Sequence, residues 1–319
     1  MAERSKRLIT DKGKLNQINP ETVALIKRYK MDMELRELSQ NTIYGYMTDL
    51  DSWLVYVLEN QNNKSALELT EDELTEFFYH CKSEGNNSRR LKRRMSSISA
   101  FYKYLRKKRI VIENPCEFID RPKRDIDINV QTFLTQEQVF LMKYKLKEQA
   151  KSGKQKDADL RLYALFSLST MARVHAIASI KWEQVNLSER TVIDVLEKEG
   201  KIVTLYYSEE VKDLLYETKK ERERTGYDDG GYVFGKNGKA VGVDVLERLA
   251  KKVGKLIDVP TLHPHDFRHS GSQLLKLNGC PIEQISELLN HSGLDVTKKH
   301  YLRADKRKIR ADKDRYEVA

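Results

Sequence analysis

Histidine, arginine and tyrosine side chains gather near the end of the chain, between His263 and Tyr301. A tyrosine hydroxyl can act as a nucleophile, and arginine and histidine can bind and protonate an oxyanion. Arginine also presents its N–H donors in a fixed fork that matches a phosphate. Histidines can bind metal, but His263, His265 and His269 lack the H-E-x-x-H spacing of a helical zinc site, and no paired cysteines lie near them. The residue types therefore suit metal-free attack of a tyrosine on a phosphodiester.

Two helical patterns must position these polar residues. The apolar residues of the two patterns are Leu274, Leu275 and Leu277, followed by Ile282, Ile285, Leu288 and Leu289. Gly279 ends the first helix, and Pro281 opens the second. Polar residues such as His265 and Arg268 then fall at helix ends or on short connections. Rigid helices would thus place polar groups around a shared point.

The order of three short motifs resembles the tyrosine recombinase (phage integrase) family. The chain has HDFRH at 265–269, then LNHS at 289–292, and then Tyr301. Members of that family show H-x-x-R-H, then L-G-H-S, and then a tyrosine a short helix further on. The resemblance is specific, because three separate motifs occur in order at about the distances that the family shows.

A further arginine follows the buried helix that the pattern predicts over 160–171. The segment TMARVHA around Arg173 resembles the family's T-G-x-R-x-x-E, in which the arginine is catalytic. Ala176 stands where the family usually has a glutamate that helps to orient the active-site arginine or histidine, so this support is either missing or supplied elsewhere. Met171 and Asn290 replace glycines of the family, and both changes require backbone tolerance more than chemistry.

The second half of the chain mixes helices with one β-hairpin. A capping box at Thr135 opens it, and residues 191–196 and 201–207 are rich in β-forming residues on either side of a tight turn. The family places its catalytic lysine on this hairpin. Lys198 at the turn is our choice for that lysine, and Lys201 is the alternative because the length of the hairpin varies.

The first half of the chain is predicted to be a helical bundle with a basic last helix. Apolar residues at helical spacing indicate the bundle over residues 21–118, with Ser88 as the N-cap of its last helix. Acidic residues are absent from 89–112, whereas solvated helix faces usually mix both signs of charge. We therefore expect five side chains to contact DNA phosphates, namely Arg89, Arg90, Lys92, Arg93 and Arg94.

This half also resembles the SAM-like core-binding domain of the same family. Residues 39–50 match its opening S-x-x-T-x-x-x-Y-x-x-D-L, and residues 97–105 with Asn114-Pro115 match its closing. The implied fold is mainly α with a small β-sheet in the second domain: a helical core-binding domain and a mixed α+β catalytic domain. The predicted parts are a flexible tail (1–20), the core DNA-binding domain (21–118), a linker (119–132) and the catalytic domain (133–319).

The resemblance implies one catalytic set, which consists of Arg173, Lys198, His265, Arg268, His291 and Tyr301. In that reading the tyrosine forms a 3′-phosphotyrosyl bond, the arginines clamp the phosphate, and His291 donates a hydrogen bond to it. His265 takes the tyrosine proton, and Lys198 protonates the leaving 5′ oxygen. The covalent bond keeps the energy of the phosphodiester, so rejoining would need no cofactor, metal or ATP. The implied partners are duplex DNA and further copies of the chain: a homotetramer on two DNA sites, exchanging strands through a Holliday junction, and a monomer or dimer off DNA.

Composition agrees with a DNA-binding protein of the cytoplasm. The net charge of +10 favours a polyanionic partner. The sequence has no apolar run that could span a bilayer and no signal-peptide core at its start, and its three cysteines lack C-x-x-C spacing. We therefore expect a cytoplasmic protein of prokaryotic, phage or mobile-element origin, without a membrane partner. The short segment before the bundle favours simple Xer-like recombinases over lambda-type integrases, which carry an extra arm-binding domain.

Two other functions stay open on the sequence alone. One is an architectural DNA-binding protein with a decayed site, for which Ala176 leaves room although the catalytic set is complete. The other is a type IB topoisomerase, which uses the same tyrosine chemistry to relax supercoils; the Xer-like order of the bundle favours recombination instead. The resemblance further implies that the tail after the nucleophile docks on a neighbouring protomer, and we expect this of the region around Ile309 and Tyr316.

Overall fold

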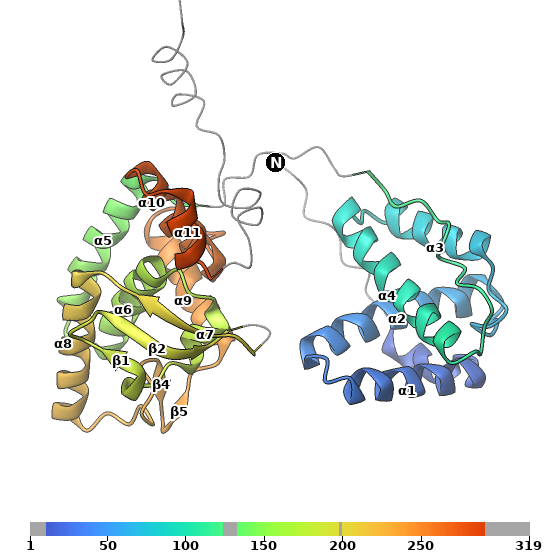
Figure 1. Cartoon of the computed structure of the whole chain (residues 1–319), viewed down its shortest axis with the longest axis horizontal. Helices are drawn as coiled ribbons and strands as arrows, with labels where there is room; N and C mark the ends of the chain where they lie inside the picture. The colour runs from blue at the N-terminus through green and yellow to red at the C-terminus, as the bar shows by residue number, and fades with distance from the viewer. Residues whose placement is uncertain (1–10, 124–132, 198–199, 291–319) are drawn as a thin grey trace, which may run out of the picture. The chain divides into compact units, whose positions relative to one another are not determined.

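The computed structural model describes residues 11–123, 133–197 and 200–290, and the chain divides into two compact units (Figure 1). The first unit comprises residues 1–130 and the second residues 131–319. Each has its own apolar core. Helices dominate both units, and small antiparallel sheets occur in the second. The predicted fold class is therefore confirmed.

The first unit is a helical bundle (blue to cyan in Figure 1). Its elements are η1 (Lys12–Gln17), α1 (Pro20–Leu35), α2 (Gln40–Asn60), α3 (Glu71–Ser83) and α4 (Ser88–Lys107). Ser39 caps α2, and Thr70 forms a capping box on α3. Helix α4 is capped by Asn87 instead of Ser88: the Asn87 side chain accepts from the backbone N–H of Arg90, so Ser88 is the first helical residue.

Aromatic side chains fill the centre of this bundle. The ring of Trp53 lies 6.1 Å from that of Phe101 and 5.8 Å from that of Tyr102, in edge-on contacts that aromatic pairs prefer. Residues outside the predicted range of 21–118 also belong to the unit. Ile18 is buried in its core, and Ile119 packs against it.

The second unit is built around one buried helix. Its helices are α5 (Gln136–Ala150), α6 (Gln155–Thr170), α7 (Val174–Ser179), η2 (Trp182–Gln184), α8 (Glu209–Thr225), α9 (Val243–Leu256), α10 (Pro264–Leu277) and α11 (Ile282–Leu288). Helix α6 begins before the predicted Leu160 and packs against α5, α8, α9 and α10. Because neighbours cover it on several sides, side chains around its circumference, such as Leu162, Tyr163 and Phe166, are fully buried.

The predicted hairpin forms the main sheet of this unit. Strands β1 (Val185–Asn186), β2 (Thr191–Leu196) and β3 (Ile202–Tyr206) pair antiparallel in that order. A β-bulge interrupts β2, since Val192 pairs with Leu205 but Val195 pairs with Val203. The extra residue shifts the alternation by one, so Val192 and Val195 both face the core.

A single antiparallel bridge joins Tyr232 to Lys181. A short hairpin of β4 (Gly235–Lys236) and β5 (Lys239–Ala240) follows it. Asn237 and Gly238 join these two strands, both with positive φ. None of the described helices is both long and apolar enough to cross a bilayer.

Candidate active site

Arg268 ties together three segments that lie far apart in the sequence. It lies in α10 and is only 1% exposed. Its Nη1 donates a hydrogen bond of 2.6 Å to the carbonyl of Met171, and its Nη2 donates to the carbonyl of Leu289. Met171 comes shortly before Arg173, and Leu289 opens the LNHS motif. One buried guanidinium therefore fixes the backbone next to two of the motifs that the sequence singles out.

The backbone at both glycine replacements adopts the left-handed conformation. Met171 has φ 53° and Asn290 has φ 51°. Met171 ends α6 in this conformation, and its N–H donates to the carbonyl of Ser167. A left-handed residue with a side chain costs about 1–2 kcal/mol, less for asparagine, whose short polar side chain tolerates it. The prediction that these two positions require backbone tolerance is confirmed.

A glycine allows α10 to approach the end of α6. A Cβ atom at Gly271 would lie 2.5 Å from the carbonyl oxygen of Leu168 and 2.6 Å from Cγ of Met171. Real Cβ atoms do not come so close to backbone, so a larger residue would push the helices apart. Gly271 therefore helps to hold Arg268, one turn away, within reach of the Met171 carbonyl.

A buried glutamate lies between the two arginines. Arg173 is the N-cap residue of α7, and its Nη1 forms an ion pair with Oε2 of Glu197. The Arg173 side chain is 33% exposed, whereas that of Glu197 is only 2% exposed. The other oxygen, Oε1, lies 4.0 Å from Nη1 of Arg268 and has no hydrogen-bond partner among the described residues. The carboxylate thus faces both guanidinium groups.

The histidines of α10 divide into one structural residue and one pair. His263 caps the helix, and its Nδ1 lies 3.0 Å from the Asp266 carboxylate, which raises the pKa of His263. The rings of His265 and His269 meet edge to face at 5.0 Å. Burial, and then the charge of Arg268, lowers the pKa of His265. Burial, and then His265, lowers the pKa of His269 to about 4. At neutral pH, His265 is therefore uncharged and able to accept a proton.

The described part of the chain brings Arg173, His265 and Arg268 close together. Three predicted catalytic residues lie outside the described residues: Lys198, His291 and Tyr301. Lys201, the alternative to Lys198, is exposed, and its carbonyl accepts a hydrogen bond of 2.8 Å from the N–H of Glu197. Within the described ranges, no group of three or more His, Cys, Asp or Glu side chains could hold a metal ion.

Sequence reasoning missed Glu197. Strict alternation from the inward Val192 would direct the side chain of residue 197 outward, and the bulge reverses this. A signal was nevertheless present. The chain lacks a carboxylate at Ala176, and a glutamate directly precedes the predicted catalytic Lys198.

The basic helix α4 presents only part of its charge to solvent. Arg89 and Arg93 are exposed, and Arg90 and Lys92 are half-buried. Arg94 is 1% exposed, on the same side of the helix as the core residues of the bundle. Arg94 is therefore the least accessible of the five side chains expected to contact DNA, because helical periodicity turns it inward.

Two of these arginines have structural partners in the bundle. The Nε of Arg94 donates a hydrogen bond of 3.0 Å to the side chain of Asn86. Arg93 forms an ion pair of 2.6 Å with Asp49, whose second oxygen accepts a hydrogen bond of 2.9 Å from Ser97. The Asp49 side chain is 1% exposed, so this pair anchors α4 to α2.

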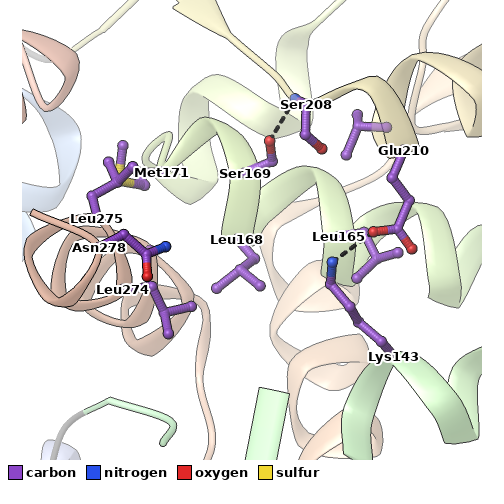
Figure 2. Close-up of a pocket in the computed structure, with 12 residues that line it drawn as sticks. Lys143, Leu165, Leu168, Ser169, Met171, Ser208, Glu210, Leu274, Leu275 and Asn278 are labelled. Carbon is purple, nitrogen blue, oxygen red and sulfur yellow. Dashed lines mark hydrogen bonds and ion pairs between the residues drawn. The ribbon is translucent and has the colours of Figure 1, made fainter. Parts of the chain in front are cut away.

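A separate pocket of about 220 Å³ opens between α6, α8 and α10 (Figure 2). Leu165 and Leu168 from α6 line it, with Leu274 and Leu275 from α10 on the other side. Lys143 and Glu210 form a 2.6 Å ion pair beside it. This lining is largely apolar and its lysine is already paired, so the pocket does not suit a phosphate.

Two tyrosine recombinases are similar to this chain over most of its length. The chain is similar to the tyrosine recombinase XerD of Oceanobacillus iheyensis, with 24% identity over 273 residues, covering 82% of this chain and 87% of that protein. It is also similar to the tyrosine recombinase XerC of Leptospira interrogans, with 27% identity over 282 residues, covering 86% of each.

Solved structures share the fold. The XerH site-specific recombinase bound to its palindromic difH substrate has a TM-score of 0.73 at 19% identity, covering 96% of this chain and 87% of that chain. The Tn1549 transposon integrase in complex with transposon right end DNA has a TM-score of 0.68 at 20% identity, covering 92% of this chain and 99% of that chain.

Two family matches cover most of the chain. Residues 26–109 match the N-terminal SAM-like domain of phage integrases, and residues 132–308 match the phage integrase family. The second match alone includes more than half of the chain and contains every predicted catalytic residue. The chain therefore belongs to the phage integrase family of tyrosine site-specific recombinases.

Proposed function

We propose that the chain cleaves and rejoins duplex DNA through a 3′-phosphotyrosyl intermediate, and that it exchanges strands through a Holliday junction. One observation carries the proposal: Arg173 and Arg268 meet across the buried Glu197, and an uncharged His265 lies one helical turn from Arg268. Two guanidinium groups beside a proton acceptor are what attack on a phosphodiester requires. The relatives named above are recombinases, which supports the same reaction here.

Each step of the cleavage reaction can be assigned to one side chain. Tyr301 loses its proton to His265, and its oxygen forms a bond to phosphorus. The bond from phosphorus to the 5′ oxygen breaks, and Lys198 gives that oxygen a proton. His291 donates a hydrogen bond to a non-bridging oxygen. The reverse attack by a 5′ hydroxyl restores a phosphodiester, so the cycle needs neither an added cofactor nor ATP.

The two arginines differ in access. Arg173 is partly exposed and can reach a phosphate from the surface of the unit. Arg268 is buried, so its contact with phosphate requires its enclosure to open when DNA binds. Each such donor aimed at the developing charge stabilises the transition state by about 3–4 kcal/mol in comparable enzymes.

The partners follow from the same reading. Arg89 and Arg93 on α4 offer exposed positive charge to the DNA backbone, with Arg90 and Lys92 beside them. Strand exchange between two sites needs four cleavages, and hence four copies of the chain acting on two duplexes. The tail that would dock on a neighbouring copy, around Ile309 and Tyr316, lies outside the described residues. We place the protein in the cytoplasm of a bacterium or of the host of a mobile element.

Covalent trapping tests the proposal. The protein is incubated with DNA from the flanks of its own gene, in intact and nicked form, and denatured in SDS before electrophoresis. We expect DNA-linked protein for the natural sequence and none for Tyr301→Phe. Tight binding without any adduct on either substrate would support an architectural protein instead.

A second assay separates recombination from relaxation. Supercoiled plasmid carrying two cleavage sites is incubated with the protein, and the products are examined for four-way junctions and exchanged segments. Junctions and exchange are expected. Relaxed plasmid without either product would assign the chain a topoisomerase activity and would contradict the proposed exchange.

A further inference from the structure

We propose that Glu197 positions Arg173 and Arg268 for the phosphate, in place of the glutamate that is missing at position 176. The inference deepens the proposed function and rests on it, because the value of a fixed arginine pair lies in binding the reacting phosphate. Glu197 touches no reacting atom, so it is a positioning residue. Its role was hidden in the sequence because its side chain turns inward only through an irregularity of the strand.

The β-bulge explains how a glutamate at the end of β2 reaches the arginines. Ile193 is 43% exposed and Leu196 is 60% exposed, while Val195 and Glu197 point inward. Asp194 has φ 53°, and it is here that the strand gains its extra residue. The alternation then resumes one position later, which directs residue 197 to the core side.

Contacts outside the ladder hold the bulge in place. Nε2 of Gln184 donates hydrogen bonds to the carbonyls of Ile193 (3.1 Å) and Asp194 (2.8 Å). These are the two residues whose ladder pairing the bulge disrupts. The direction of the Glu197 side chain is therefore fixed by packing and by specific hydrogen bonds, as a positioning residue requires.

The two oxygens of the Glu197 carboxylate compensate the positive charges of both arginines. A carboxylate is costly to bury unless cations compensate it, and here Oε2 pairs with Arg173 while Oε1 faces Arg268 at 4.0 Å. Without that negative charge, two guanidinium groups would repel one another across a buried space. Glu197 therefore holds the pair together before a phosphate with its own negative charge arrives.

Position 176 shows why the carboxylate is needed at 197. Ala176 lies three residues after Arg173, on a helix where that spacing places side chains on neighbouring positions of one face. It is 2% exposed and carries no polar group. Arg173 instead forms its ion pair with Glu197, which follows β2 in another part of the unit.

The experiment compares four proteins in single-turnover cleavage of a nicked DNA substrate: the natural sequence, Glu197→Gln, Glu197→Asp and the control Glu209→Gln. Glu209 is an exposed carboxylate of the same unit that also pairs with an arginine, Arg190. We expect Glu197→Gln to slow cleavage by about 10²-fold at unchanged DNA affinity, since misplacing groups by about 1 Å has this cost. Glu197→Asp keeps the charge and should recover part of the rate, and Glu209→Gln should match the natural protein.

Relocation of the carboxylate is the sharper test. Adding Ala176→Glu to Glu197→Gln restores a carboxylate next to Arg173, and we expect at least about tenfold recovery of the cleavage rate. Equal rates for Glu197→Gln and the natural protein would overturn the inference. So would a loss that appears only as lower thermal stability, equally in Glu197→Gln and Glu197→Asp, because a purely structural role predicts that pattern.

A chemical readout keeps this inference separate from the proposed function. A dicarbonyl reagent modifies accessible arginines, and peptide mass spectrometry gives the rate at Arg173 without any DNA. Glu197→Gln should raise this rate several-fold, while the rate at exposed Arg248 serves as the internal standard. Faster labelling in a protein that never cleaves DNA would keep the positioning role and reject the recombinase. Unchanged labelling together with normal cleavage would reject the positioning role and keep the recombinase function.

Discussion

A buried carboxylate pairs with a partly exposed arginine in both units, in different surroundings. In the first unit, Asp49 is 1% exposed and pairs with Arg93, which is 48% exposed. In the second unit, Glu197 is 2% exposed and pairs with Arg173, which is 33% exposed. Each pair therefore joins a buried carboxylate to a partly exposed arginine across two elements of the fold.

The second oxygen of each carboxylate separates the two cases. In Asp49 it accepts a hydrogen bond from Ser97, so both oxygens are paired and the group ties two helices together. In Glu197 the second oxygen has no hydrogen bond within the described residues and faces the buried Arg268 instead. The fully hydrogen-bonded network of Asp49 stabilises the fold. The cluster around Glu197 keeps charge that is only partly paired, and a site that binds another charged group needs such charge.

Equivalent substitutions at the two arginines give the largest predicted difference. Lysine keeps the charge but loses the planar fork of donors that matches a phosphate. Arg173→Lys should lower single-turnover cleavage by about 10²–10³-fold, as removal of one transition-state donor does. Arg93→Lys should leave the cleavage step within about twofold once the protein is saturated with DNA. Similar losses in both variants would remove the distinction between the two pairs.

Loss of the Asp49 charge should destabilise the first unit. Asp49→Asn keeps the size of the side chain but weakens the bonds from Arg93 and Ser97, and hydrogen bonds to charged groups contribute about 1.5–3 kcal/mol. Because Arg93 is half exposed, we expect a loss near the lower end of that range. Hydrogen exchange of peptides from α2 and α4 measures it. Unchanged exchange there would show that Asp49 does not anchor the bundle.

Acid should loosen the second unit through His269. Burial lowers the pKa of His269 to about 4 in the folded chain, so the unfolded chain, with a pKa near 6.5, takes up the proton first. The free energy of unfolding should therefore fall as the pH drops from 6.5 to about 4. His263 opposes this trend, because Asp266 raises its pKa. Exchange of α10 peptides across this pH range tests the effect, and His269→Gln should flatten the profile.

The smallest expected effect concerns DNA contact by α4. Arg89 is exposed, so Arg89→Ala should weaken binding similarly on all DNA sequences and reduce the slope of log affinity against log salt by about one. Arg224→Ala, at an exposed arginine paired with Glu221 on α8, is the matched control and should leave the slope unchanged. A normal slope for Arg89→Ala would exclude this residue from the phosphate contacts.

Local patterns in the sequence predicted most of the fold. Helical periodicity and capping residues located the helices, and the backbone requirement at Met171 and Asn290 followed from glycines in the resembled motifs. Two features depended on information that such patterns do not hold. Arg94 belongs to a continuous basic run, and only the packing of α4 shows that it faces the core. Glu197 needed the register of the hairpin, because a single extra residue in β2 reverses its side.

Mapping the covalent bond identifies the nucleophile. After reaction with a nicked substrate, nuclease and protease digestion leaves a nucleotide on the peptide that held the DNA, and mass spectrometry identifies the modified residue. We expect a phosphodiester-linked nucleotide on Tyr301, absent from Tyr301→Phe and strongly reduced in Arg173→Lys. A nucleotide on any other residue, or cleaved DNA with no modified peptide, would contradict this expectation.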